Sequence, residues 1–434
     1  MRDSARKVLE GIREEFKLSA ADMNKMIRDF RREMDRGLRG RKSSLKMLPS
    51  YVTKPTGNEK GAFLAIDLGG TNLRVAEVEL KGAGKEIAYR SKSFILKDKL
   101  ISGSSGKFFD AIAEHLRRFI GRRDIGAGIP MKLGFTFSFP VRQDSLRSGR
   151  LICWTKGFSV KGVKGKDVVK LLEEALKRKG LGGIRVSALM NDTVGTLAAR
   201  SYSDSSCEVG VVIGTGTNAC YYDKRLGTII NIEWGNFNRM KRALYDRLLD
   251  ENSGNPGEQL LEKSVSGMYL GEIVRLIICD LASRGYLFRR FSSTALIKKN
   301  VLKAEDISRM EEPGEKGLAN ADKVLRRYGM MNSTIGERSL VRQLCRIVSR
   351  RAARISSAGI IAVLKKIDPV FSRSHTVAID GSVFEKHPNF AKEMRSGIKD
   401  VLGVRSEKVK IVLSKNGSAL GAGVAAAISQ SHSL

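Results

Sequence analysis

The sequence predicts an α/β protein built as two lobes with a cleft between them, and three observations carry this prediction. Strand and helix patterns alternate from about residue 62 to about residue 140, the order that builds sheets covered by helices. A strand, a Gly-Thr-Gly turn and a second strand at 208–223 then repeat the pattern of AIDLGGTNLRVAEVEL at 65–80. Both turns are glycine-rich hairpins typical of phosphate binding, so an internal duplication with one phosphate loop in each lobe is expected.

The first half of the chain begins with two helices and continues as an alternating pattern of strands and helices. Residues 1–46 carry apolar side chains at helical spacing on otherwise charged segments, which predicts two amphipathic helices. A strand pair at about 62–80 follows. After it come, in order, a strand around SKSFIL, a helix KFFDAIAEHLRRFIG, a strand MKLGFTFSFP, a helix DVVKLLEEALKRKG and a strand that enters a helix, IRVSALMNDTVGTLAAR.

The second half begins with the hairpin at 208–223 and is then mainly helical from 255 to 366. A third strand with a glycine turn is expected at 375–388, in HTVAIDGSVFEKHP. The segment 409–428 predicts a strand, a glycine-rich turn and a helix of small residues.

Composition excludes several classes of protein. The chain has 434 residues, of which 42% are hydrophobic and 6% aromatic, as expected for a soluble globular protein with a large core. No apolar run approaches the roughly 18 residues of a membrane span, and the N-terminus is charged, so a cytoplasmic protein is expected. Five widely spaced cysteines and four scattered histidines argue against a disulfide framework, a zinc site or a Ser/His hydrolase. Catalysis would then rest on carboxylates.

The formal net charge of +32 has two interpretations. It favours binding of polyanions, or it reflects a general enrichment of Lys and Arg on solvated faces. The basic residues are spread along the chain, including the run at 29–43, and no nucleic-acid-binding module accompanies them. Weak polyanion binding and no specific nucleic-acid partner are therefore expected.

The segment AIDLGGTNLR at 65–74 is typical of a phosphate-binding hairpin. Gly69 and Gly70 let the backbone approach an anion that a side chain would hold away. Asp67 is positioned to face a magnesium ion through water, while Thr71 and Arg74 can reach phosphate oxygens. An ordinary Gly-Gly hairpin turn remains the alternative from these residues alone.

Eight segments in register resemble the eukaryotic-type hexokinase and glucokinase family, within the superfamily of actin-like ATPase (ribonuclease H-like) folds. They are AIDLGGTNLR, LGFTFSFP, RLICWTKGF, ALMNDTVGTLAAR, IGTGTNACYYD, NIEWGNF, NPGEQLLEK and VAIDGSVFEKHP. The resemblance covers nearly the whole chain. It implies a two-lobed kinase that uses ATP and Mg²⁺ to phosphorylate the 6-hydroxyl of glucose and related hexoses, the first step of glycolysis.

The resemblance also implies the catalytic residues. Asp192 matches the family's base, which accepts a proton from the sugar because a primary hydroxyl is a poor nucleophile at neutral pH. Taken alone, a carboxylate at this position would more often cap a helix. Lys156 is the second catalytic residue, and sugar binding is expected to close the cleft by induced fit and expel water.

The remaining expected contacts fall into two sets. For the sugar, whose hydroxyls require polar groups converging from several directions, the family motifs imply Ser138, Thr155, Lys156, Asn191, Asp192, Asn218, Glu233, Gln259 and Glu262. For the nucleotide they imply Asp67, Gly69, Gly70, Thr71, Asn72, Arg74, Thr215, Gly216, Thr217, Gly359, Gly381, Ser382, Gly417 and Ser418. Gly359 is expected to border adenine.

The chain departs from the family at the C-terminal glycine turn. Lys415, Asn416, Gly417, Ser418 and Ala419 stand where the family has an acid followed by Gly-Ser-Gly. The change removes one negative charge and one glycine beside the expected nucleotide. Only seven residues, KRLGTII, separate YYD from NIEWGNF, where relatives often carry a longer loop.

We expect N-terminal helices in 1–60 that pack on the large domain, a small domain of 61–190 together with the C-terminal helix 417–434, and a large domain of 191–416. A monomer or homodimer is expected. Three alternatives stay open at this point: a sugar sensor on the same fold without turnover, a hexokinase that also binds polyanions, and a related kinase for fructose, mannose or glucosamine.

Overall fold

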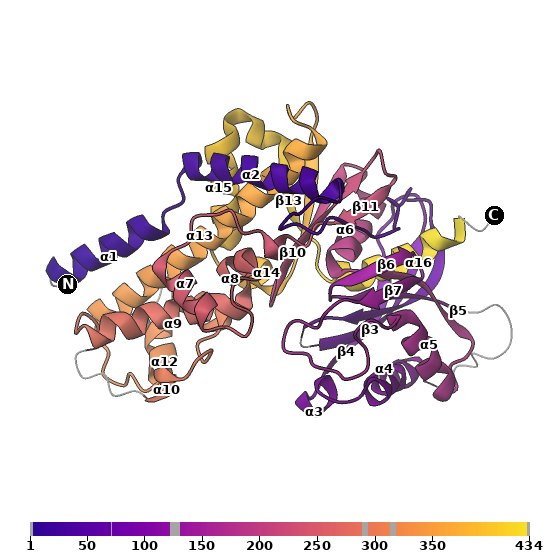
Figure 1. The fold of residues 1–434 in the computed structure, drawn as a ribbon, viewed down its shortest axis with the longest axis horizontal. Helices are drawn as coiled ribbons and strands as arrows, with labels where there is room; N and C mark the ends of the chain where they lie inside the picture. Colours follow the sequence, from indigo (N-terminus) through magenta and orange to yellow (C-terminus); the bar gives the residue numbers. More distant parts are fainter. Residues whose placement is uncertain (1–2, 71, 122–130, 289–293, 313–317, 432–434) are drawn as a thin grey trace.

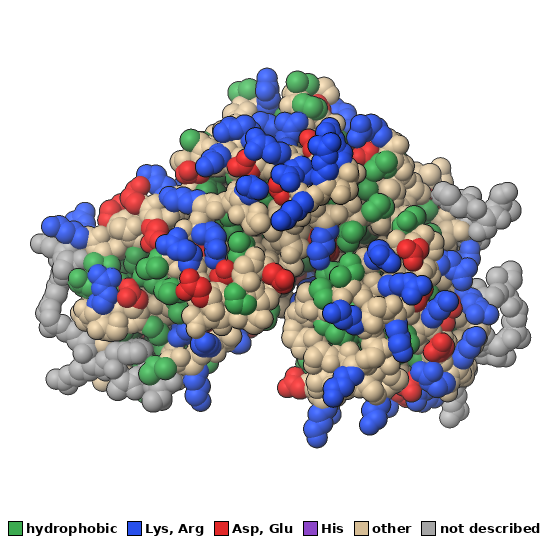
Figure 2. All heavy atoms as spheres, viewed as in Figure 1, with side chains coloured by type: hydrophobic (Ala, Val, Ile, Leu, Met, Phe, Trp, Pro, Cys, Tyr) green, Lys and Arg blue, Asp and Glu red, His purple; other side chains and the backbone are tan. Residues whose placement is uncertain are grey.

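The computed structural model describes residues 3–70, 72–121, 131–288, 294–312 and 318–431. Figure 1 shows two lobes, the larger one containing the N-terminal helices and the smaller one lying beside the C-terminus. Figure 2 shows a notch between them in the same view. The expected two-lobed arrangement is confirmed.

The small lobe has a five-stranded sheet in the order β4-β3-β2-β5-β8. Its strands are β2 Lys60–Leu68, β3 Asn72–Lys81, β4 Ala88–Ile95, β5 Met131–Phe137 and β8 Ile184–Met190. Helices α4 Ser105–Ile120 and α5 Val168–Arg178 pack together with the sheet around one apolar cluster. The short helix α3 Asp98–Ile101 and the hairpin of β6 Val141–Ser145 and β7 Ser148–Leu151 complete this lobe.

The large lobe has a six-stranded sheet in the order β1-β11-β10-β9-β12-β13. Its strands are β1 Leu48–Pro49, β9 Cys207–Ile213, β10 Thr217–Asp223, β11 Thr228–Asn231, β12 His375–Asp380 and β13 Val409–Leu413. Its helices are α1 Asp3–Phe16, α2 Ala20–Leu38, α6 Asp192–Ser203, α7 Leu244–Glu251, α8 Leu260–Val265, α9 Gly267–Ser283, α10 Thr294–Ile297, α11 Ala304–Glu311, α12 Ala319–Arg327, α13 Ile335–Ile367, α14 Ser382–Lys386 and α15 Phe390–Leu402. Two 3₁₀ turns, Trp234–Asn236 and Gly403–Lys408, complete it.

The two sheets share one plan. In each sheet, three strands that follow one another in the chain pair antiparallel. Two later strands then add in parallel beside the first of these three, which is β2 in one sheet and β9 in the other. The small lobe uses β4-β3-β2 and then β5 and β8, while the large lobe uses β11-β10-β9 and then β12 and β13. The expected duplication of architecture is therefore confirmed.

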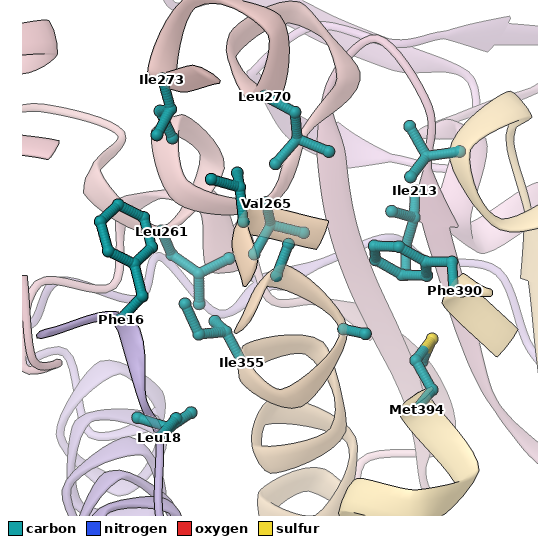
Figure 3. Close-up of a cluster of buried hydrophobic side chains, with 14 of the residues drawn as sticks. Phe16, Leu18, Ile213, Leu261, Val265, Leu270, Ile273, Ile355, Phe390 and Met394 are labelled. Atoms are coloured by element: carbon teal, nitrogen blue, oxygen red, sulfur yellow. The ribbon is translucent and has the colours of Figure 1, made fainter. Parts of the chain in front are cut away.

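The N-terminal helices belong to the large lobe by their packing. Met23, Met26, Ile27 and Phe30 recur at helical spacing on α2 and are buried, while Ser19 caps the first turn. Helix α2 packs on α13 and α15, and α1 packs on α13. Figure 3 shows the apolar cluster of this lobe, where side chains from the α1 to α2 connection lie near those of α8, α13 and α15.

The chain crosses between the lobes three times: once from β1 of the large-lobe sheet to β2 of the small-lobe sheet, and twice from a strand into a helix. Strand β8 belongs to the small-lobe sheet, but α6 packs on the large-lobe sheet; β13 belongs to the large-lobe sheet, but helix α16 Gly417–Ser431 packs on the small-lobe sheet. The two helices touch closely: a Cβ at Gly421 would lie 1.8 Å from the carbonyl oxygen of Gly195. Only glycine permits this approach.

Helix α2 packs on helices of the large lobe, and α16 packs on the small-lobe sheet. The domain boundaries at 60/61, 190/191 and 416/417 stay predictions.

Candidate active site

A cleft of about 150 Å³ lies where strands and turns of both lobes meet. Small-lobe residues reach it from the β2 turn, the end of β5 and the loop after β7, and large-lobe residues reach it from the β9 to β10 turn and the region around α8. All the residues expected to bind the sugar line this one cleft: Ser138, Thr155, Lys156, Asn191, Asp192, Asn218, Glu233, Gln259 and Glu262. Gly70, Thr215, Gly216 and Thr217, from the expected nucleotide set, line it too.

Asp192 is the first residue of α6. The helix cap itself is the preceding Asn191, whose Oδ1 accepts the Thr193 N–H at 3.1 Å. Asp192 Oδ1 accepts the same N–H at 2.9 Å, while Oδ2 lies 3.9 Å from the ammonium of Lys156. Because Asn191 fills the capping role, Asp192 keeps one oxygen for the cleft, where its side chain is 15% exposed.

Lys156 approaches from the small lobe. Its backbone is in the left-handed region, at φ 56°, in the loop that follows β7. The ammonium donates to the carbonyl oxygen of Ser138 at 2.8 Å and lies over the ring of Phe139. A Cβ at Gly70 would come within 3.1 Å of the Lys156 stem, so the glycine turn leaves the room that the lysine occupies.

An amide network holds the large-lobe wall of the cleft. Asn218 Nδ2 lies 3.2 Å from Asn191 Oδ1, 2.7 Å from Asn231 Oδ1 and 3.2 Å from Glu233 Oε1. Asn231 in turn donates to Glu233 Oε1 at 2.9 Å. The sequence prediction missed Asn231, although it stands two residues before Glu233 in the NIEWGNF segment. The network fixes the Glu233 carboxylate, whose residue has left-handed backbone at φ 57°.

Glu262 supports the second hairpin from α8. Its Oε2 accepts the Thr217 N–H at 3.0 Å, and a Cβ at Gly216 would lie 2.7 Å from the same oxygen. Burial raises the pKa of the Glu262 carboxyl, and the nearby carboxylates of Glu233 and Asp192 raise it further against the opposing effect of Lys156. A side chain at Gly216 would make the Glu262 carboxylate shift away from the turn.

Thr217 does not offer its hydroxyl to a phosphate, contrary to expectation. The hydroxyl donates to the carbonyl oxygen of Val212 at 2.9 Å and accepts the indole N–H of Trp234 at 3.0 Å. Its backbone N–H is taken by Glu262. All three polar bonds face inward, because Thr217 begins β10 and braces the turn against the core.

Three carboxylates converge on the nucleotide side of the cleft. Burial raises the pKa of Asp67 to about 6, although Arg74, whose guanidinium lies 4.0 Å away, lowers it; Asp192 and Asp380 raise it further. Burial also raises the pKa of Asp380. The sequence prediction missed Asp380, although AID at 378–380 repeats AID at 65–67. Because these charges repel one another, a cation beside Asp67 would be stabilised.

The glycine turns of the large lobe meet at this edge. Gly381, at φ 113°, would place a Cβ 2.5 Å from the carbonyl of Ile213, so only glycine fits there. Ser382 is exposed at the start of α14, and Thr215 is exposed in the other turn. Ser418 donates its N–H to Asp380 at 3.4 Å, and its buried hydroxyl lies beside the Asp67 carboxylate, whose pKa its hydrogen bond lowers.

The other expected nucleotide residues have mixed positions. The Gly69 N–H donates to the carbonyl oxygen of Asn72 at 3.0 Å, and Asn72 is exposed. A Cβ added at Gly417 would lie 3.2 Å from Thr196 Cα. Thr71 lies outside the described residues. Gly359 is buried in α13, where an added Cβ would lie 2.8 Å from the indole of Trp234, and its contact with adenine stays a prediction. Its small size serves packing.

The altered C-terminal turn has its own contacts. Lys415 lies 3.1 Å from Glu385, and Asn416, at φ 59°, donates to the hydroxyl of Tyr89 at 2.9 Å. Ala419 is buried. A small-lobe side chain thus contacts the turn at the position where the family has an acid.

Two features are absent from the described part of the chain. No group of three or more His, Cys, Asp or Glu side chains there is arranged to hold a metal ion. None of the helices built from those residues combines the length and apolar character needed to cross a bilayer.

Two lobes of one strand order, joined at a helix crossing around a polar cleft, define a sugar kinase of the actin-like ATPase fold. Two family models, both described as hexokinase, match the chain, one at residues 8–202 and the other at residues 208–428. The chain therefore belongs to the hexokinase family, and it is an ATP-dependent hexokinase, a phosphotransferase with an alcohol group as acceptor.

Individual relatives agree. The chain is 40% identical to Hexokinase-7 of Oryza sativa subsp. japonica, over 98% of this chain and 97% of that protein. It is 35% identical to a hexokinase of Kluyveromyces lactis, over 97% of this chain and 92% of the other. Among solved structures, a Schistosoma mansoni hexokinase complexed with glucose superposes with a TM-score of 0.87 at 35% identity, covering 98% of this chain and 99% of that one.

Proposed function

We propose that this hexokinase transfers the terminal phosphoryl group of ATP to the 6-hydroxyl of glucose, with Asp192 as the base. The observation that carries the proposal is the Asp192 carboxylate, which has one oxygen directed to the cleft and 3.9 Å from Lys156. The glucose held by the Schistosoma mansoni relative supports the choice of sugar.

In this proposal the sugar lies along the amide wall. Its hydroxyls donate to the carboxylates of Glu233 and Glu262, and the amide of Asn218 forms a further hydrogen bond to the sugar. The set of sugar contacts is completed by Ser138, Thr155, Asn191 and Gln259. The hydroxyl of Ser138 is buried without a hydrogen-bond partner in the described ranges, so binding a sugar hydroxyl there removes an unsatisfied group. A sugar lacking one hydroxyl or holding the wrong epimer leaves buried acceptors unpaired, which gives the site its selectivity.

Asp192 then accepts the proton of the 6-hydroxyl as its oxygen bonds to phosphorus. Lys156 offsets negative charge as the phosphoryl group moves toward the sugar, and the amides of the two glycine turns surround that group. Both hairpins begin at strand ends that face the cleft, so the donors are held in position before the substrates arrive.

The residues also fit magnesium. A buried carboxylate whose pKa is raised to about 6 by burial lies in a site of excess negative charge, and Mg²⁺ in proteins is often held by one or two carboxylates with water and phosphate. Asp67 would hold the ion through water, with Asp380 close by. When bound, magnesium neutralises charge on the phosphates of ATP.

A coupled assay of ADP release over a sugar panel tests the proposal. With ATP and Mg²⁺, we expect glucose to be turned over, and the panel of fructose, mannose and glucosamine ranks the other sugars. Release of ADP that is no greater than that of Asp192→Ala for every sugar would leave only a non-catalytic sugar sensor. Small-angle scattering with and without glucose tests closure, since the radius of gyration should fall.

The cytoplasmic location and the monomeric or homodimeric state stay predictions.

A further inference from the structure

The exposed face of α2 forms a basic hollow that is separate from the catalytic cleft. It has a volume of about 470 Å³ and is lined by Arg28, Arg31, Arg32, Asp35, Arg36, Arg39 and Arg41. Figure 2 shows Lys and Arg side chains gathered at the top of the molecule, where Figure 1 places α2 and α15. We call these seven residues the α2 basic hollow. None of them lines the cleft that contains Asp192.

Helical periodicity explains how the arginines come together. Arg28, Arg32, Arg36 and Arg39 recur three or four residues apart and so share one side of α2, whereas the buried residues Met26 and Phe30 lie on the other. The stretch from 28 to 39 spans about 16 Å of helix axis. The turn after the helix folds back, with the Arg41 N–H donating to the Arg36 carbonyl at 2.9 Å, and adds Arg41 to the hollow.

The hollow lacks matching negative charge. Its one carboxylate, Asp35, already pairs with Lys366 at 2.5 Å. Arg32 pairs only with the neighbouring Asp29, at 3.5 Å and with its own side chain 70% exposed. Within the described ranges, no carboxylate lies within 4.0 Å of a guanidinium of the other five arginines, and the buried Nε of Arg31 donates to no acceptor. A buried donor without an acceptor is uncommon in folded proteins.

Two further cations approach from other elements. Lys365 in α13 has a lowered pKa, because of burial and of the nearby guanidinium groups of Arg31 and Arg405. Arg405 belongs to the 3₁₀ turn that follows α15. Positive groups from three elements thus repel one another here, and a bound anion would remove that repulsion.

We propose that the α2 basic hollow binds a compact, freely diffusing anion that carries several phosphate groups. The planar fork of arginine matches phosphate oxygens in pairs, and six forks around one hollow can bind several phosphates at once. No aromatic or aliphatic side chain lines the hollow. Nucleic-acid bases would have no aromatic surface to stack on, and lipid tails would have no apolar surface to enter. A small anion that fits the hollow is therefore favoured over a nucleic acid or a membrane.

Binding of tripolyphosphate to the full chain, measured by calorimetry at low salt, tests this proposal. Saturating ADP and glucose are present so that the catalytic cleft is filled. The variant Arg31→Gln/Arg36→Gln removes two central guanidiniums, and Lys170→Gln/Lys177→Gln removes the same charge from exposed positions on α5. We expect the first variant to bind about tenfold more weakly, or worse, and the second within about twofold of the parent, because only charge-assisted hydrogen bonds differ between them.

Folding of each variant is checked by glucose-dependent ADP release without tripolyphosphate, which should equal that of the parent. If the double variant does not fold, Arg36→Gln alone should weaken binding about threefold. Orthophosphate should bind more weakly than tripolyphosphate because it engages fewer arginines. Equal affinities for both double variants would overturn the proposal, as would binding of anionic vesicles or a single-stranded RNA with no binding of tripolyphosphate.

Discussion

The turn after β2 in the small lobe and the turn after β9 in the large lobe occupy the same place in two sheets of the same strand order, yet their charges come from different sources. In β2 the residue before the last is Asp67, which pairs in register with Arg74; in β9 the same position is Val212, opposite Asn218. The second turn instead receives its carboxylate, Glu262, from α8. Strand order fixes where a turn lies, and the side chains around it decide its chemistry.

The largest expected effect on kcat distinguishes the start of α6 from the start of α16. The substitution Asp192→Asn at the start of α6 keeps the shape of the side chain but removes the basic oxygen. We therefore expect kcat to fall by about 10²- to 10⁴-fold. The measurement is the coupled assay at saturating glucose and ATP.

The matched variant is Ser418→Ala at the start of α16, which removes a hydroxyl but no base. It should keep kcat within about tenfold and mainly raise the KM for ATP. Equal losses of kcat in the two variants would contradict the assignment of the base to α6.

Gly421→Ala should break the contact between the lobes. Its methyl group would meet the carbonyl oxygen of Gly195 at 1.8 Å, and backbone cannot move aside as a side chain can. We expect a loss of about 3 kcal/mol or more in the free energy of unfolding, at the upper end of overpacking effects. Urea denaturation measures it, and an unchanged midpoint would show that the helices are farther apart.

The two hairpins should respond differently to neutralisation of their carboxylates. Glu262→Gln removes charge beside the sugar wall and should raise the KM for glucose about tenfold or more, with a smaller change in the KM for ATP. Asp67→Asn should raise the KM for ATP with magnesium and leave that for glucose nearly constant. Steady-state kinetics with each substrate varied in turn measures both; parallel changes in the two variants would refute the division of roles.

Asp67 should also cost stability when no ligand is bound. Its pKa is raised from the ordinary 3.8 to about 6, so the folded state binds the proton more tightly than the unfolded state does. Stability from this group is then greatest at low pH and falls as the pH rises through the window between these values. In EDTA at pH 7, Asp67→Asn should therefore be more stable than the parent by about 1 to 3 kcal/mol.

The advantage of Asp67→Asn should shrink as the pH is lowered from 7 to 4, because the parent carboxyl becomes protonated. Urea denaturation at several pH values measures it. Asp144→Asn is the control: that side chain is 57% exposed on β6, and its replacement should change stability by less than about 0.5 kcal/mol. A constant advantage at all pH values would exclude titration of Asp67 as the cause.

Apart from the controls, the smallest expected change in stability comes from Gly11, which contrasts with the tightly packed Gly421. Gly11 lies within α1, and a Cβ added there would meet no atom within 4 Å. Gly11→Ala should therefore stabilise the protein by about 0.5 to 1 kcal/mol, because alanine loses less conformational entropy in a helix. A thermal melt measures it. Destabilisation would mean that α1 packs more tightly than its contacts indicate.

The family resemblance supplied the cleft residues, such as Asp192 and Ser138, and local pattern was sufficient to predict the glycine turns and most of the strands. It was insufficient where a role depends on a partner far along the chain. Thr217 matches the family's second phosphate segment, but the indole N–H of Trp234, from another element, donates to its hydroxyl. Gly359 matches a family position near adenine, and in the structure it packs against the same indole.

The two missed residues carried signals that only comparison within the chain makes visible. Asp380 repeats Asp67 in a second AID segment, but its proximity to Asp67 depends on the sheets facing each other. Asn231 completes the amide network only because β10 and β11 pair in register, with Cys220 opposite Asn231. Pairing of this kind is a property of the folded sheet.

The crossing of α6 and α16 has a consequence for how the enzyme moves. Two of the three connections between the lobes, β8 to α6 and β13 to α16, enter these helices at their first residues, Asp192 and Gly417. When one lobe rotates relative to the other, atoms near the hinge axis move least and atoms far from it move most. Closure of the cleft about this crossing would therefore move Asp192 less than the outer walls of the cleft, which would bring the substrates to it.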